Sequence, residues 1–172
     1  MIREMFVVGI LLASGCATTL ETVYVPAENK GWKVGSGTNN PGATLVEFIP
    51  VDETISNWSR MFTIQFLEGT RAAPSDFMKT LQAQAVSRCP KTQWVVISDS
   101  SLSTTYQWSI SSCPGHPDQT EIARLIRGND GLHRIAYVRR TSTLDPSERD
   151  TWLDAFAKAY VEKGGRRVVV AP

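Results

Sequence analysis

The feature that most constrains the fold is a series of short apolar runs separated by turn residues. The clearest pair spans residues 121–127 and 132–139, joined by Gly128-Asn-Asp-Gly131, whose residues accept the positive φ of a tight turn. Such a connection predicts two neighbouring antiparallel strands. A helix over 118–127, begun by Asp118, is the competing interpretation. The Asn-Asp-Gly sequence favours the hairpin, because it fits a reverse connection better than the plain end of a helix.

Four further runs have the composition of β-strands. Residues 44–49 are rich in β-branched and aromatic side chains, and residues 61–67 alternate between apolar and polar positions. Residues 93–97 form an apolar run, and residues 104–110 alternate again. The region around Trp32 can add a short edge strand before them.

Two segments have the spacing of amphipathic helices. The first begins at Pro74 and ends before Pro90, and the second begins at Asp145 and ends at Gly164-Gly165. The apolar stripe of the second helix consists of Trp152, Phe156, Ala159 and Tyr160. Residues 166–170 then form a tail or a terminal edge strand.

The order of these elements is β-β-α-β-β-β-β-α. Hairpin-length connections make the sheet antiparallel, and two amphipathic helices have to bury their apolar stripes against it. We therefore predict an α+β fold, with an antiparallel sheet of about six strands packed by two amphipathic helices. A length of 172 residues fits one such domain.

The first sixteen residues have the organisation of a secretory signal. Arg3 and the terminal amine precede an apolar run that ends at Leu12, and small residues follow. The run is too short to cross a bilayer, which needs about 20 apolar residues. The sequence LASGC over residues 12–16 resembles the bacterial lipobox, which implies cleavage before Cys16 and acylation of that cysteine. Two alternatives stay open: an ordinary cleaved signal peptide, in which Cys16 is incidental, and a start at Met5 instead of Met1.

The same resemblance implies a location and partners. In such lipoproteins an Asp after the cysteine often retains the protein in the inner membrane, and here Ala17 occupies that position. We expect the chain at the outer membrane, facing the periplasm, bound to the membrane through lipid on Cys16 and to other envelope proteins. Residues 1–15 are then a signal peptide, 16–41 a lipidated tether with an irregular approach, and 42–172 the single α+β domain.

Only Cys89 and Cys113 remain once Cys16 is assigned to lipid. Two cysteines in an exported chain form a disulfide more often than a metal site, and the pair lacks Cys-x-x-Cys spacing. We predict a Cys89–Cys113 bridge.

The element order resembles the fold shared by the Mog1 and PsbP proteins. The segments around residues 46–48 and 57–61 are similar to those of uncharacterised exported bacterial proteins of that kind. The resemblance spans most of residues 44–162 and brings no catalytic motif with it. It implies that the domain binds or assembles with partners instead of catalysing a reaction.

Charge indicates one candidate surface. The formal net charge of +1 gives no general affinity for nucleic acid, but arginines gather in the last third of the chain. A solvated face balanced by acidic residues is the competing interpretation, and anionic lipid or an acidic protein would fit a basic face. The candidate binding surface consists of Arg124, Arg127, Arg134 and Arg140 with the aromatic residues Tyr106 and Trp108.

Catalytic and metal motifs are weak. The chain has no Gly-x-Ser-x-Gly elbow, although the turn around Asp99 holds serines that His133 could approach. The spacing of His116, Asp118 and Glu121 does not match a zinc site. We therefore assign no catalytic residue, cofactor or metal, and predict a lipid-anchored binding or assembly protein. A small-ligand-binding lipoprotein is the first alternative, and a hydrolase is the second.

Overall fold

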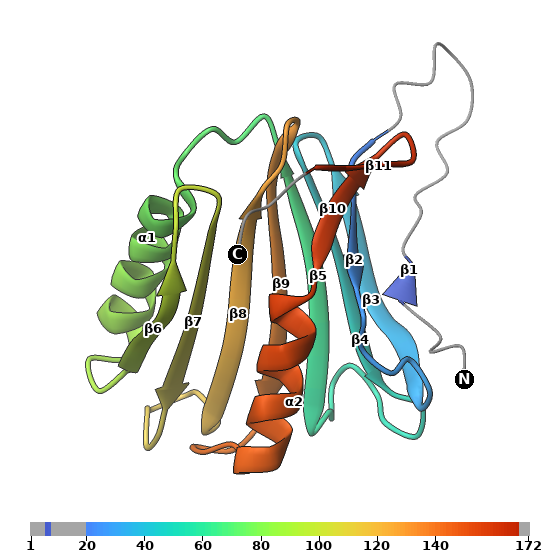
Figure 1. Ribbon diagram of the computed structural model, residues 1–172. Coiled ribbons are helices and arrows are strands. Elements are labelled where there is room, and N and C mark those ends of the chain that lie inside the picture. Colours follow the sequence, from blue (N-terminus) through green and yellow to red (C-terminus); the bar gives the residue numbers. More distant parts are fainter. Residues whose placement is uncertain (1–5, 8–19, 169–172) are drawn as a thin grey trace.

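The computed structural model describes residues 6–7 and 20–168, and confirms an α+β fold with two helices and antiparallel sheets (Figure 1). Cys16 and most of the predicted leader lie outside these residues. The elements are β1 (Phe6–Val7), β2 (Thr22–Val25), β3 (Trp32–Asn40), β4 (Ala43–Pro50), β5 (Arg60–Glu68), α1 (Pro74–Arg88), β6 (Gln93–Asp99), β7 (Ser103–Ile110), β8 (Gln119–Arg127), β9 (Gly131–Arg139), α2 (Pro146–Ala157), β10 (Tyr160–Lys163) and β11 (Arg166–Val168).

The larger sheet has seven strands in the order β3-β4-β5-β9-β8-β7-β6. Every neighbouring pair is antiparallel, and the predicted hairpin of β8 and β9 lies near its centre. The strand interpretation of residues 121–127 is therefore confirmed over the helical one. A second, smaller sheet has the order β1-β2-β10-β11, whereas the sequence predicted one sheet of about six strands.

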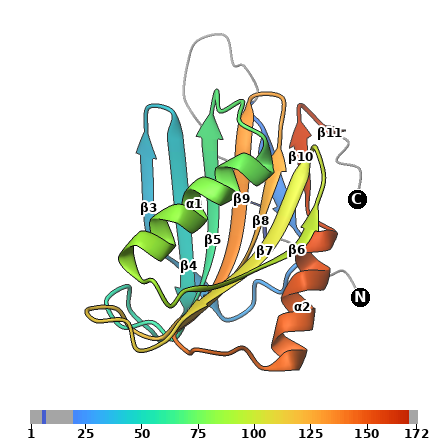
Figure 2. The same cartoon turned by 90° about the vertical axis from the view of Figure 1, so that its left-hand side faces the viewer.

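The two faces of the larger sheet have separate cores. On one face, α2 and the smaller sheet bury Phe62, Tyr137, Trp152 and Phe156, whose rings pack against one another. On the other face, α1 lies across the strands and buries Met78 against the sheet (Figure 2). Alternation along each strand supplies both faces, which is why the central strands are buried on both sides.

Two parts of the fold differ from the expectation. The segment predicted as a tether and irregular approach, residues 16–41, contains β2, which was not expected. The edge strand predicted around Trp32 is present as β3, but it is longer than expected, with nine residues. Residues 160–163, predicted as the end of the last helix, form β10 instead. This strand pairs with β2, which lies near the other end of the chain. The secondary structure of β2 and β10 depends on their pairing with each other, because a four-residue strand is too short to show a periodic pattern in the sequence.

The described residues contain no helix that is both long enough and apolar enough to cross a membrane.

Candidate functional site

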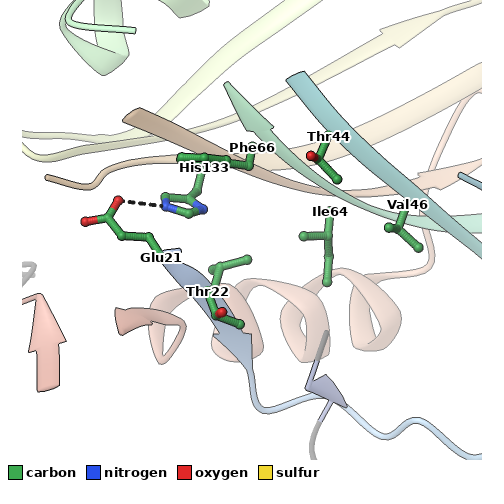
Figure 3. A pocket seen from close by; sticks show the side chains of 8 residues that line it. Glu21, Thr22, Thr44, Val46, Ile64, Phe66 and His133 are labelled. Carbon is green, nitrogen blue, oxygen red and sulfur yellow. Dashed lines mark hydrogen bonds and ion pairs between the residues drawn. The ribbon is translucent and has the colours of Figure 1, made fainter. Parts of the chain in front are cut away.

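A buried pair of a carboxylate and an imidazole joins the beginning of β2 to the larger sheet. The Glu21 carboxylate lies 3.3 Å from Nε2 of His133 on β9, and both side chains are almost fully buried (Figure 3). The backbone N–H groups of Asn129 and Asp130 also donate to this carboxylate, at 2.6 and 3.1 Å. The His133 ring stacks on Phe66, with 4.6 Å between ring centroids.

Local sequence explains how the carboxylate reaches the β8–β9 turn. A Cβ atom at Gly128 would lie 2.0 Å from Oε2 of Glu21, so glycine is the residue that leaves room for it. Burial acts to raise the pKa of Glu21, but the hydrogen bonds from His133, Asp130 and Asn129 outweigh it and hold the pKa below its ordinary value. Glu21 is therefore an ionised structural link.

The cavity beside this pair is small. Its volume is about 40 Å³, and its walls are largely apolar, including Val46, Ile64 and Phe66 (Figure 3). One water molecule occupies about 30 Å³ in the liquid, so this cavity has no room for a substrate. Within the described residues, His133 contacts Glu21 and Phe66 and is not brought to the serines near Asp99.

A larger cavity, which we call the aromatic cavity, lies between α1 and the strands beneath it. It has a volume of about 140 Å³ and is lined by Leu81, Gln84, Ala85, Arg88, Trp94, Tyr106, Trp108, Glu121 and Arg134. Trp94 stacks on Tyr106 and on Trp108, with centroid distances of 4.8 and 6.3 Å. The indole N–H of Trp94 donates to the sulfur of Met78, which fixes the ring against α1.

A charged pair forms the floor of the aromatic cavity. Arg134 donates to the Glu121 carboxylate at 2.6 Å and to the Tyr106 hydroxyl at 3.3 Å. Burial raises the pKa of Tyr106 to about 12, so its hydroxyl stays protonated. Burial alone would lower the pKa of Arg134, but Glu121 and Tyr106 raise it above its ordinary value. The floor is therefore neutral overall and already satisfied.

The edge strand β6 borders the aromatic cavity and is open on its outer side. Among residues 6–7 and 20–168 it pairs with β7 only, and the exposed fractions of Val95, Val96 and Ile97 are 57%, 47% and 36%. Val96 lies opposite Tyr106, on the α1 face, and Val95 projects to the other face. Three consecutive exposed apolar residues on an unpaired edge are unusual, because proteins commonly protect such edges with charges.

The structure separates the six residues of the predicted binding surface. Arg124 is buried and donates to the carbonyls of Phe156 and Ala157 at the end of α2. Arg127 donates to the carbonyls of residues 71 and 72, and Arg140 stacks on Trp58 at 4.4 Å. Only Arg134, Tyr106 and Trp108 come together, in the aromatic cavity. Partial burial and internal partners explain why the arginines do not form one basic face.

Cys89 and Cys113 lie close together, whereas the three candidate metal ligands do not form a site. The Cys89 and Cys113 sulfurs lie at bonding distance with Cα atoms 5.9 Å apart, which is compatible with the predicted disulfide. The described part of the chain holds no group of three side chains suited to a metal, so His116, Asp118 and Glu121 do not form one there. Sequence reasoning missed Glu21, although the β-branched and aromatic run that follows it, TVYV, is a strand signal.

Comparison of the chain with known protein families and with curated proteins gives no match.

Proposed function

We propose that this protein is a lipid-anchored envelope lipoprotein that binds an extended segment of another envelope protein beside β6. The anchor is inferred from the LASGC sequence at residues 12–16, and Ala17 favours the outer membrane with the domain facing the periplasm. The observation that supports the binding mode is the open edge of β6, with Val95, Val96 and Ile97 exposed next to the aromatic cavity.

Strand addition fits this edge. A segment aligned with β6 would pair with the outer backbone N–H and C=O groups of that strand. Its side chains would point alternately to the α1 face and to the α2 face of the sheet. On the α1 face those side chains would meet Val96, Trp94 and the aromatic cavity. The charged floor is neutralised internally by Arg134 and Glu121, so the best occupant carries an apolar side chain there.

The size of the cavity also favours a protein partner over a small ligand. Ordinary ligand pockets measure about 300–1,000 Å³, and a cavity of about 150 Å³ holds a single ring-sized apolar group. At about 140 Å³ the aromatic cavity suits one side chain of a bound segment. The resemblance of the element order to the fold of the Mog1 and PsbP proteins is in keeping with a binding role.

Site-specific photo-crosslinking in the native envelope tests the binding mode. We expect a photoreactive residue at Val95 to give an adduct with another envelope protein, and mapping to place the crosslink in one extended segment. Val96→Lys in the same chain should abolish the adduct, because a charge blocks the edge. Val34, exposed by 62% on the opposite edge strand β3, is the matched control for both changes.

Two results would contradict this mode. Equal adducts from positions 34 and 95 would indicate non-specific contact. An adduct between two copies of this chain would identify self-association as the use of the edge.

Intact mass of the protein purified from its own membranes tests the anchor. We expect a chain that begins at Cys16, carries acyl mass and gains two protons on reduction of the Cys89–Cys113 bridge. Cys16→Ala should remove the acyl mass and release the protein from the membrane fraction. An unlipidated wild-type chain in the soluble fraction would contradict the proposed lipid anchor.

A further inference from the structure

Glu21 fixes the point at which the chain enters the folded domain. Its buried carboxylate is held by His133 and by the N–H groups of Asn129 and Asp130 in the β8–β9 turn. β2 then runs away from this turn, and Val23 and Val25 are buried in the core (Figure 1). The position of residue 21 is therefore firmly tied to one end of the larger sheet.

We call this end of the sheet the basic end. It holds the β8–β9 turn, the β10–β11 hairpin and the beginning of the β5–α1 loop, at the top of Figure 1, and the β3–β4 and β6–β7 turns are hydrogen-bonded to the neighbouring strand ends. Arg71 in the loop donates to the carbonyl of Asn129, and Lys163 in the hairpin pairs with Asp130 at 2.7 Å. Direct contacts thus join the loop and the hairpin to the turn that holds Glu21.

Outside the buried pair, cations outnumber carboxylates by one at the basic end. The cations are Arg71, Arg127, Lys163, Arg166 and Arg167, and the carboxylates are Glu68, Asp99, Asp130 and Glu162, with Asp99 at the end of β6, beside the β6–β7 connection that is hydrogen-bonded to Arg127. Arg71, Arg166 and Arg167 are exposed to solvent. Asp130 is occupied by Lys163, and Glu162 lies opposite Arg167 in the hairpin.

The length of chain between Cys16 and Glu21 limits how the domain can be oriented. Five residues span at most about 18 Å when fully extended. A nine-residue strand such as β8 is about 30 Å long. If lipid holds Cys16 at a membrane surface, Glu21 cannot lie at the far end of the domain from that surface, because the connection is too short.

We propose that the basic end faces the bilayer and that its exposed cations contact anionic lipid headgroups. This inference rests on the lipid anchor proposed above. The anchor supplies the attachment, and the cations orient the domain, so that β6 and its open edge project away along the side of the molecule. Weak contacts suffice for this, because the anchor keeps the cations at a high effective concentration near the headgroups.

Hydrogen exchange on vesicles tests the orientation. The lipidated protein that begins at Cys16 is incorporated into phosphatidylethanolamine vesicles with or without phosphatidylglycerol, and backbone exchange is followed by mass spectrometry. We expect phosphatidylglycerol to slow exchange at residues 128–131 and 163–167. The Arg71→Glu, Arg166→Glu double variant should lose this slowing, and so should the wild type in high salt.

The matched control reverses two exposed lysines at the opposite end, Lys30→Glu and Lys91→Glu, and should keep the slowing. Exchange in neutral detergent should be the same for all three proteins, which shows that the variants are folded. Slowing that is independent of phosphatidylglycerol, or lost equally in both variants, would overturn the orientation. Failure of the wild type to float with either vesicle would overturn the anchor itself, and flotation distinguishes the two failures.

Discussion

Glu21 contributes to the fold as a carboxylate, and its effect should depend on pH. Its pKa in the folded protein lies below the ordinary 4.5, because donors in the fold outweigh the effect of burial. The stabilisation is therefore fully present above about pH 4.5 and is lost as the pH falls through the lower folded-state pKa. Sequence patterns identified His133 as a candidate but not its partner, because the pair joins residues 112 positions apart.

We expect Glu21→Gln to lower the free energy of unfolding by about 1–3 kcal/mol at pH 7, because it weakens hydrogen bonds to a buried charge. Urea unfolding at several pH values checks this, and the deficit should shrink towards pH 3. Glu68→Gln, at an exposed carboxylate, is the control and should stay within about 0.5 kcal/mol of wild type. A deficit that grows in acid would contradict the assignment.

The pair of Glu121 and Arg134 carries a second prediction. Glu121→Ala leaves the buried guanidinium of Arg134 without its carboxylate, and such a change typically costs about 3–5 kcal/mol. Adding Arg134→Met should recover most of the loss, since the uncompensated charge is then gone. Urea unfolding of both variants measures the two changes in the free energy of unfolding. A double variant less stable than Glu121→Ala alone would show that the arginine stabilises through packing instead.

At the scale of elements, local patterns were sufficient where a strand is long or a turn is distinctive. The hairpin of β8 and β9 and the helix α1 follow the prediction closely, because alternation and turn residues define them within the segment. β2 and β10 do not, since each is four residues long and is stabilised mainly by the other. The bulge in β6 near Val96 likewise has no sequence signal.

The link between the end of α1 and the β7–β8 connection yields a prediction for one element. Cys89 and Cys113 are 24 residues apart, and a disulfide closing such a loop stabilises by roughly 3 kcal/mol in the chain-entropy account. The Cys89→Ser, Cys113→Ser variant should lose about that much, and reducing agent should lower the stability of the wild type alone. Both are measured by urea unfolding. An equal effect of reductant on the variant would argue against the bridge.

The whole molecule is a sheet with a core on each face, and its two proposed contacts lie on different sides. The open edge of β6 is a lateral edge of the larger sheet. The basic end lies where the strands of that sheet turn, at one end of their length (Figures 1 and 2). A domain that meets lipid at one end therefore leaves its edge accessible to a partner. Sequence could predict the two helices and the antiparallel sheet, but the placement of these surfaces depends on tertiary contacts.

Removal of the predicted signal peptide tests whether the fold depends on β1. β1, at Phe6–Val7, lies within the predicted signal peptide and pairs with Tyr24 and Val25 of β2. β2 is also held by β10 and by its buried valines, so cleavage before Cys16 should leave the rest of the fold intact. We expect a chain of residues 16–172 to match the full chain within about 0.5 kcal/mol in urea unfolding. A markedly less stable short chain would mean that β1 belongs to the working domain, and cleavage before Cys16 would then be untenable.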